Sequence, residues 1–279
     1  MPVQILPNGI GELLGDPLVT GKPLYTGNQI YYVSSIDGSD SYDGKRKSFP
    51  FATLVHAISA AAAGDMIVCL DGHTESPTVL TTIALASLTI VGSGQSNGKP
   101  TVKINSNAAT SVGLFVVNAS GIQIRNIYFP PPKQANFASR IKVTANDFRC
   151  IGCYFEQASD ASEAGGVAVE IGTAASFPRL DNCTFITDPP PGTLENIGDL
   201  PAAGLAVSGS GLSGVEMYGC VFSGRYSGAA VDFANAVTRV RFERTAFLNG
   251  ADAILGASTQ VYLNLTPSSQ DALINWSVV

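Results

Sequence analysis

Apolar and polar residues alternate through most of the chain after residue 80, in a phrase that recurs five times with variations. One copy runs from Val215 to Phe222. Each copy closes on a phenylalanine, and these residues are Phe129, Phe155, Phe185, Phe222 and Phe247. Alternation of this kind predicts strands with one buried face, and a repeat of 25 to 37 residues predicts stacked coils that share one core. The pattern therefore indicates an all-β solenoid.

A fixed corner interrupts the alternation in each coil. Asn126, Gly152, Asn182 and Gly219 stand there, and these residue types favour a left-handed backbone. A second short strand opens each coil, at residues 113–117, 140–143, 166–171, 204–207, 230–233 and 253–255. Coils in register should stack the five phenylalanines along one interior line. No helical periodicity is found from residue 80 to residue 279.

Three cysteines, Cys153, Cys183 and Cys220, share a second interior position, with Ile127 and Thr245 at its ends. They can be interpreted as small buried hydrophobic residues or as a metal or redox site. Zinc ligands converge on one point, whereas these residues should form a line. The sequence therefore favours the first interpretation, and no metal or cofactor site is predicted.

The N-terminal part contains the one segment with helical periodicity, Pro50–Ala63, with Phe51, Leu54, Val55 and Ile58 on one face. Ser48 is its predicted N-cap, and Gly64–Asp65 ends it. A buried strand is expected next, over residues 65–70. A helix at this place would cover the open end of a solenoid.

The segments Tyr32–Gly44, Phe49–Thr53, Ala60–Asp65 and Ile67–Gly72 resemble the opening of right-handed parallel β-helix proteins of the pectate-lyase-like superfamily. That superfamily includes secreted polysaccharide lyases, tailspikes and bacteriophage virion proteins. The resemblance extends over about residues 31 to 265. It implies a right-handed single-stranded parallel β-helix with an N-terminal capping helix, and, for virion proteins of this kind, a homotrimer.

We predict four parts: an extended N-terminal arm at 1–30, a strand, loop and capping helix at 31–64, a parallel β-helix at 65–265 and a C-terminal tail at 266–279. The arm either lies on another subunit or folds back on the solenoid's own surface. The tail carries Trp276, the chain's only tryptophan, and should pack against a neighbour or over the last coil.

Composition narrows the classes of partner. The net charge is −6 and no basic stripe is present, which argues against nucleic acid. The apolar stretches are too short and too interrupted to span a bilayer. The chain opens without a signal segment, so we expect synthesis in the host cytoplasm and incorporation into a virion.

The outward positions of the repeated phrase carry charges of both signs: Arg125, Arg149, Arg179 and Arg241 against Asp181, Glu216 and Glu243. If the coils are in register, opposite charges should pair across neighbouring strands. A lyase needs a base such as an arginine beside acidic ligands, and Arg149 or Arg179 could serve. The mixed signs favour a solvated or subunit-facing sheet instead.

Two polar clusters near the N-terminus contain residues that could bind a metal ion or transfer protons. Asp37, Asp40 and Asp43 resemble a calcium loop in composition but lack its bidentate glutamate, so turns built from aspartate side chains are preferred. Asp71, His73 and Glu75 follow a predicted strand and form a candidate acid–base group.

The loop Gly92–Gly98 follows a predicted strand but opens no helix, which leaves a phosphate-binding role without support.

No catalytic, cofactor-binding or metal residue is therefore assigned. The predicted function is that of a non-enzymatic bacteriophage virion protein, a capsid decoration or turret-like protein that contacts sister subunits and the major capsid or other virion proteins. Two alternatives remain: a tail fibre or tailspike component, and a polysaccharide lyase or hydrolase that depolymerises host surface glycans. In the latter case the arginine stripe or the loop 71–75 would carry the activity.

Overall fold

A computed structural model describes residues 29–105, 113–131, 138–158, 166–173, 175–188, 200–235 and 237–248. It also gives the backbone of strands β1 to β4 near the N-terminus and β27 to β29 near the C-terminus.

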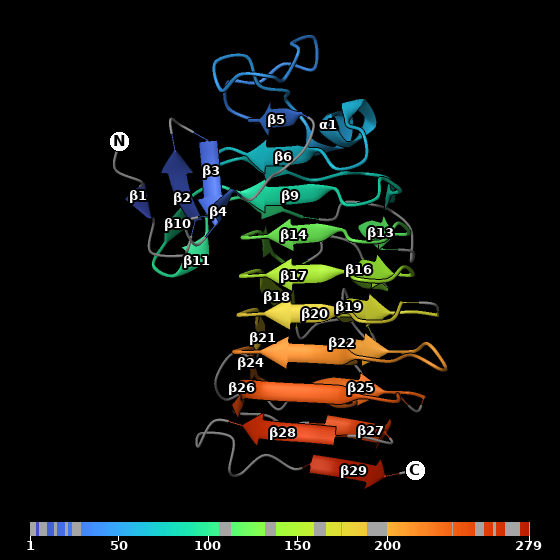
Figure 1. Cartoon of the computed structure of the whole chain (residues 1–279). Helices are drawn as coiled ribbons and strands as arrows, with labels where there is room; N and C mark the ends of the chain where they lie inside the picture. The colour runs from blue at the N-terminus through green and yellow to red at the C-terminus, as the bar shows by residue number, and fades with distance from the viewer. Residues whose placement is uncertain are drawn as a thin grey trace.

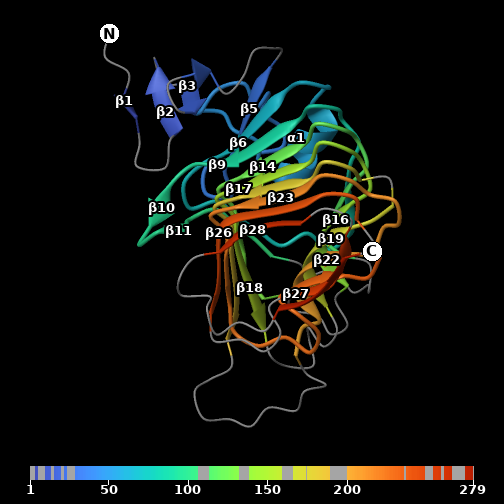
Figure 2. The same cartoon turned by 60° about the horizontal axis from the view of Figure 1, so that its bottom comes forward.

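Three parallel sheets run the length of a rod (Figures 1 and 2). The first sheet consists of β5 (Ile30–Val33), β6 (Met66–Cys69), β9 (Thr89–Gly92), β14 (Gln123–Arg125), β17 (Arg149–Ile151), β20 (Arg179–Asp181), β23 (Val215–Tyr218), the first part of β26 (Val240–Leu248) and β28 (Val261–Leu265). The second consists of β7 (Thr74–Glu75), β12 (Lys103–Ile104), β15 (Tyr128–Phe129), β18 (Tyr154–Ala158), β21 (Thr184–Asp188), β24 (Val221–Ser223) and the end of β26.

The third sheet contains β8 (Thr81–Ile83), β13 (Phe115–Val117), β16 (Ser139–Val143), β19 (Val167–Ile171), β22 (Ala203–Val207), β25 (Val231–Phe233), β27 (Ile254–Ser258) and β29 (Ile274–Val278). The coils from β6 to β25 each contribute one strand to each sheet, and the pairings within the three sheets are parallel. The predicted right-handed parallel β-helix is thereby confirmed.

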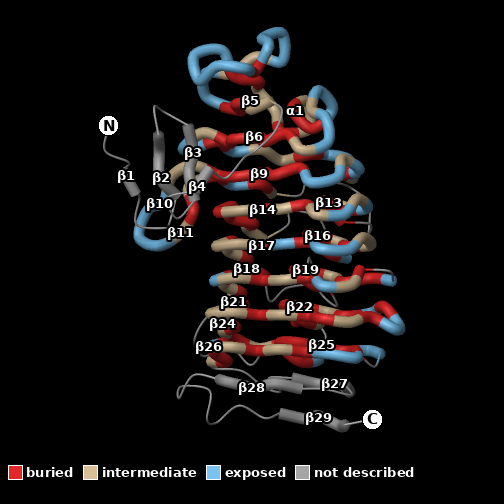
Figure 3. Tube along the Cα trace, in the orientation of Figure 1, coloured by how far each residue is buried: buried red, intermediate tan, exposed pale blue. Residues whose placement is uncertain are grey.

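The phenylalanine ladder has the predicted register. Phe129 pairs with Phe155, Phe155 with Phe185, Phe185 with Phe222, and Phe222 with Phe247. The ring centroids are 4.8, 4.9, 4.5 and 5.2 Å apart along the ladder, and successive planes are within 13° of parallel. Figure 3 shows the buried positions that alternate with partly exposed ones along the strands.

The corners are left-handed, as predicted. The φ angles are +51° at Asn126, +61° at Gly152, +51° at Asn182 and +61° at Gly219. Arg244 occupies the same position in the next coil with φ of +51°, a conformation that is costly for a residue of its type. The cysteines occupy the interior position just after the corner. Cys153, Cys183 and Cys220 are buried, and the thiols of Cys183 and Cys220 each lie 3.4 Å from a carbonyl oxygen of the preceding coil.

Helix α1 (Leu54–Ala60) is shorter than the predicted Pro50–Ala63. Its N-cap is Thr53, whose side chain accepts from the backbone N–H of His56, and the predicted cap Ser48 plays no such part. The reason is that Phe51 is extended: it forms a parallel bridge with Val33 and donates to the Tyr32 carbonyl. Leu54, Ala57 and Ile58 join the main core, at the β5 end of the rod (Figure 1).

Further strands lie near both ends of the chain. β1 (Gln4–Ile5), β2 (Ile10–Leu13), β3 (Asp16–Val19) and β4 (Lys22–Pro23) form an antiparallel sheet, within the part predicted as an arm. β29, within the predicted tail, pairs with β27 and continues the third sheet. The side chain of Trp276 lies outside the described residues. The proposed division into four parts remains a prediction. In the described part of the chain, no helix is long and apolar enough to cross a membrane.

Candidate active site on the third sheet

The outer face of the third sheet aligns polar residues from successive coils. Lys142 pairs with Glu170, Glu170 with Ala206, and Ala206 with Asp232. Each residue is the outward member of its strand, because the residues on both sides of it are buried. The sheet therefore presents an ammonium group, a carboxylate, a small apolar gap and a second carboxyl group in a line.

Glu170 is held by two partners. Lys142 Nζ lies 3.0 Å from Glu170 Oε1, and Ser208 Oγ lies 3.1 Å from the same oxygen. Asn235 Nδ2 donates to the Ser208 carbonyl at 2.8 Å and so fixes the segment that carries this hydroxyl. Both contacts use Oε1, so among the described residues no hydrogen bond or ion pair occupies Oε2.

Asp232 is in a different environment. It is half-buried, and burial raises its pKa above the ordinary aspartate value. No basic side chain pairs with it among the described residues. Desolvation without a compensating cation favours the protonated carboxyl group, which is the form that can donate a proton.

The separation of the two carboxyl groups is set by the sheet. Glu170 and Asp232 lie two strands apart, which corresponds to about 9.5 Å between their backbone positions. Ala206 lies between them and carries only a methyl group. Two carboxyl groups at such a separation are the arrangement used for general acid–base hydrolysis of glycosidic bonds.

The signal for this site is present in the sequence. Glu170 and Asp232 are the acidic residues inside the second strands 166–171 and 230–233. Among the strand positions, candidate chemistry was predicted only for the outward residues of the repeated phrase, which forms the first sheet. The aligned carboxyl groups lie on the third sheet.

The arginine stripe lies on the outer face of the first sheet. In the register of that sheet Glu216 lies between Arg179 and Arg241, so opposite charges are adjacent across neighbouring strands, as predicted. Two closer ion pairs form within strands: Arg179 Nε lies 2.8 Å from both carboxylate oxygens of Asp181, and Arg241 pairs with Glu243 at 2.7 Å. Residues two apart on a strand share a face, and the guanidinium groups of Arg179 and Arg241 also lie over the Tyr218 ring, at 4.3 and 5.2 Å from its centroid.

Of the candidate acid–base group Asp71, His73 and Glu75, the structure brings His73 and Glu75 together and gives Asp71 a different partner. The Glu75 carboxylate accepts from the backbone N–H of Leu54 at 2.6 Å and so caps α1. His73 is fully buried, with Nε2 at 3.2 Å from Glu75. Asp71 accepts a hydrogen bond from Thr101 instead.

The aspartates of the Gly- and Ser-rich loop have structural roles. Asp43 accepts from the backbone N–H of Lys45, which is the turn that was predicted. Asp40 accepts from the N–H groups of Ala52 and Thr53 and from the Thr53 hydroxyl, at 2.9 to 3.0 Å. It therefore anchors this loop to the start of α1. Among the described residues, no three His, Cys, Asp or Glu side chains come together as a set of metal ligands.

The loop Gly92–Gly98 contains one strand of a hairpin that the sequence analysis did not predict. β10 (Gln95–Ser96) and β11 (Lys99–Pro100) are antiparallel. The turn is Asn97–Gly98, and both residues have positive φ, +51° and +77°. Asn-Gly is the dipeptide most typical of two-residue hairpin turns, so the signal was available.

Comparison with known proteins supports the fold. No family model matches the chain, and no curated protein matches it. Among solved structures, pectate lyase Pel9A has a TM-score of 0.56 at 11% identity, over 89% of this chain and 80% of that one. Pectin methylesterase from Aspergillus niger has a TM-score of 0.51 at 16% identity, over 91% and 87%. ORF18 of Geobacillus virus E2, at 13% identity over 80% and 56%, has a TM-score of 0.38, too low to bear on fold or function.

These neighbours correct the predicted class of protein. The expectation of a non-enzyme is contradicted, because pectate lyase Pel9A and the pectin methylesterase, both with TM-scores above 0.5, are enzymes. The structural similarity supports the parallel β-helix of the pectate-lyase-like fold. At identities of 11 and 16% it indicates no particular reaction.

Proposed function

We propose that this protein is a polysaccharide depolymerase, and that the outer face of its third sheet hydrolyses glycosidic bonds. The observation that carries the proposal is the alignment of Glu170 and Asp232 at equivalent outward positions, two strands apart, with Ala206 between them. Asp232 is the general acid and Glu170 the general base.

The reaction is a single displacement. Asp232 donates its proton to the glycosidic oxygen as the bond from that oxygen to the anomeric carbon breaks. Glu170 takes a proton from a water molecule whose oxygen attacks the anomeric carbon from the opposite side. The products are a shortened glycan with inverted configuration and a free hydroxyl on the leaving sugar. Proton exchange with solvent then restores both carboxyl groups.

Lys142 and Ser208 are positioning residues in this scheme. The ammonium group of Lys142 and the Ser208 hydroxyl both contact Glu170 Oε1 and fix the orientation of this carboxylate. Both leave the second carboxylate oxygen to bind the water.

The biological setting that fits this activity is a bacteriophage particle whose subunits act on host surface glycans. The resemblance of residues 32–72 to β-helical virion proteins supports this setting, and a homotrimer is the expected assembly. A glycan-degrading subunit is useful where the particle meets its host, so a tailspike or tail fibre component is preferred to a capsid decoration protein.

The test is a reducing-end assay on capsular polysaccharide and lipopolysaccharide from the host. Asp232→Asn and Glu170→Gln should each lower the rate by roughly 10²- to 10⁴-fold. Asp43→Asn makes the same change in an exposed loop, keeps its turn, and should leave the rate unchanged. NMR of the first product should show inverted anomeric configuration. Unsaturated products, or loss of activity in Arg149→Ala with Asp232→Asn unaffected, would contradict the proposal and favour a lyase on the first sheet.

A further inference from the structure

The β10–β11 hairpin projects from the corner between the first and second sheets (Figure 2). Its base is fixed by Asn126, the first of the corner residues. Asn126 Nδ2 donates to the carbonyls of Gly92 at 2.7 Å and Gly94 at 3.1 Å, while Gln95 Nε2 donates to Asn126 Oδ1 at 2.8 Å. The hairpin is therefore a positioned element of the surface.

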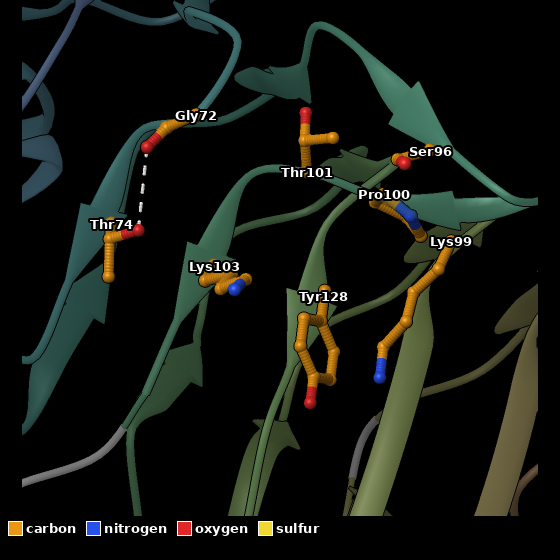
Figure 4. Close-up of a pocket in the computed structure, with 8 residues that line it drawn as sticks. All are labelled: Gly72, Thr74, Ser96, Lys99, Pro100, Thr101, Lys103 and Tyr128. Atoms are coloured by element: carbon orange, nitrogen blue, oxygen red, sulfur yellow. Dashed lines mark hydrogen bonds between the residues drawn. The ribbon is translucent and has the colours of Figure 1, made fainter.

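One cavity of about 470 Å³ lies on one side of the hairpin. Thr74, Ser96, Lys99, Thr101, Lys103 and Tyr128 line it, as Figure 4 shows. These side chains offer hydroxyl groups, one aromatic ring and two ammonium groups.

The two lysines differ in their charge balance. Lys99 Nζ lies 2.7 Å from Glu156 Oε2, and the Tyr128 hydroxyl donates to the same oxygen at 2.7 Å. Lys99 also lies over the rings of Tyr128 and Tyr154, at 3.7 and 4.4 Å from their centroids. Lys103 is exposed and forms no ion pair with any described residue. The first cavity therefore presents an uncompensated positive charge.

A second cavity of about 340 Å³ lies across the hairpin. Gln95, Pro100, Ile151, Tyr154, Asn182 and Thr184 are among its lining residues, and none of the residues that line it is charged. Pro100 lines both cavities, so the two adjoin at β11. Tyr128 borders the first and Tyr154 the second, with ring centroids 5.6 Å apart.

We propose that the two cavities form a glycan-binding site separate from the catalytic face, in which an anionic sugar occupies the first cavity and a neutral sugar the second. Lys103 binds the carboxylate or sulfate of the anionic sugar. Gln95, Asn182 and Thr184 bind the hydroxyl groups of its neutral neighbour. Paired amide and hydroxyl groups beside aromatic rings suit polyhydroxylated ligands, which combine polar groups with apolar ring carbons.

The site does not depend on the proposed hydrolysis, because it lies on the second sheet and its corner rather than on the third sheet. Binding is therefore measured with Asp232→Asn as the background, in which the glycan stays intact. The probes are maltohexaose and chitohexaose as neutral chains, oligogalacturonate as a uniformly acidic chain, hyaluronan oligosaccharides for carboxylate and keratan sulfate oligosaccharides for sulfate.

A glycan array followed by calorimetry of the positive probes tests the site. The chains that alternate charged and neutral sugars should bind, more tightly than the neutral chains. Lys103→Gln should weaken this binding roughly tenfold and reduce its salt dependence. Lys45→Gln removes the same charge from an exposed loop and should change it less than about twofold.

Asn182→Gly probes the second cavity without strain, since glycine already occupies the same corner position at residues 152 and 219. It should weaken binding of the alternating chains several-fold and leave that of oligogalacturonate unchanged. Equal binding of neutral and alternating chains, absence of any binding by the charged probes, or binding insensitive to Lys103→Gln would overturn the proposal. None of these results would bear on the reducing-end assay.

Discussion

The rings of Phe185 and Phe222 are 4.5 Å apart between centroids and 2° from parallel, the closest step of the interior ladder. Phe185 is fully buried and stacks on Phe155 on its other side. Replacing it by alanine leaves a cavity in the middle of the rod. We expect Phe185→Ala to lower the free energy of unfolding by about 3–5 kcal/mol in denaturant titrations. Phe49→Ala, at a residue that is 48% exposed, should change it by less than about 1 kcal/mol. Equal effects would show that the ladder does not carry the core.

Asp232 should set the basic limb of the pH–rate profile. Burial raises its pKa, and the proposed reaction needs its protonated form, so kcat/KM should fall as pH rises through that raised value. Because the folded state holds this proton more tightly than the unfolded state, the associated stability is full below the ordinary aspartate pKa and is lost as pH rises through the folded pKa. Both kcat/KM and the free energy of unfolding should therefore fall over the same pH range, as pH rises through the pKa of Asp232 in the folded protein. A flat profile across it would rule out Asp232 as the acid.

The Lys99–Glu156–Tyr128 cluster should contribute to stability with the opposite pH dependence. Burial acts to raise the pKa of Glu156, but hydrogen bonds from Lys99 and Tyr128 and the charges of Lys99 and Arg140 outweigh it, so the pKa lies below its usual value. The stability difference between the native protein and Glu156→Gln should be present above the ordinary glutamate pKa and vanish as pH falls through the lowered one. Thermal unfolding over an acid series measures this. A difference that persists at the lowest pH would mean that packing rather than charge is responsible.

Arg244 offers a stabilising substitution. It holds φ of +51° at a corner where two other coils use glycine, and its guanidinium is exposed and 3.9 Å from Glu243. Removing the side chain relieves a backbone cost of about 1–2 kcal/mol and loses little. We expect Arg244→Gly to raise the free energy of unfolding by about 0.5–1 kcal/mol, after the larger entropy of glycine in the unfolded chain is allowed for.

Arg225→Gly is the matched control, because Arg225 is not among the residues with positive φ. That variant should be neutral or destabilising. If the two substitutions had the same effect, the corner conformation would not be the cause.

Inward-facing residues could be predicted from the sequence because a β-helix repeats their environment in every coil. The phenylalanine positions, the cysteine positions and the corners at Asn126 and Gly152 follow from periodicity alone. α1 is shorter than predicted because Phe51 pairs with Val33, a contact between segments that local periodicity does not report.

Outward-facing residues were harder to interpret, since no core fixes their identity. The charged positions of the first sheet are the most numerous, yet they pair within strands, as Arg179 and Asp181 do. The few charged positions of the third sheet indicate a candidate site only once the register shows that Glu170, Ala206 and Asp232 are aligned. The β10–β11 hairpin follows from the turn geometry of Asn97–Gly98, whereas the glycines of this loop by themselves indicate neither a turn nor a phosphate site.

The alignment of Glu170 and Asp232 ties their spacing to the repeat of the β-helix. Backbone hydrogen bonding fixes the distance between their backbone positions in whole steps of about 4.8 Å. Removing the one coil that carries Ala206 would place these positions one step apart, near the carboxyl separation of about 5 Å found in retaining glycosidases. In such a fold the stereochemistry of the product would be decided by the number of coils between two residues, and evolution could change it by gain or loss of a repeat.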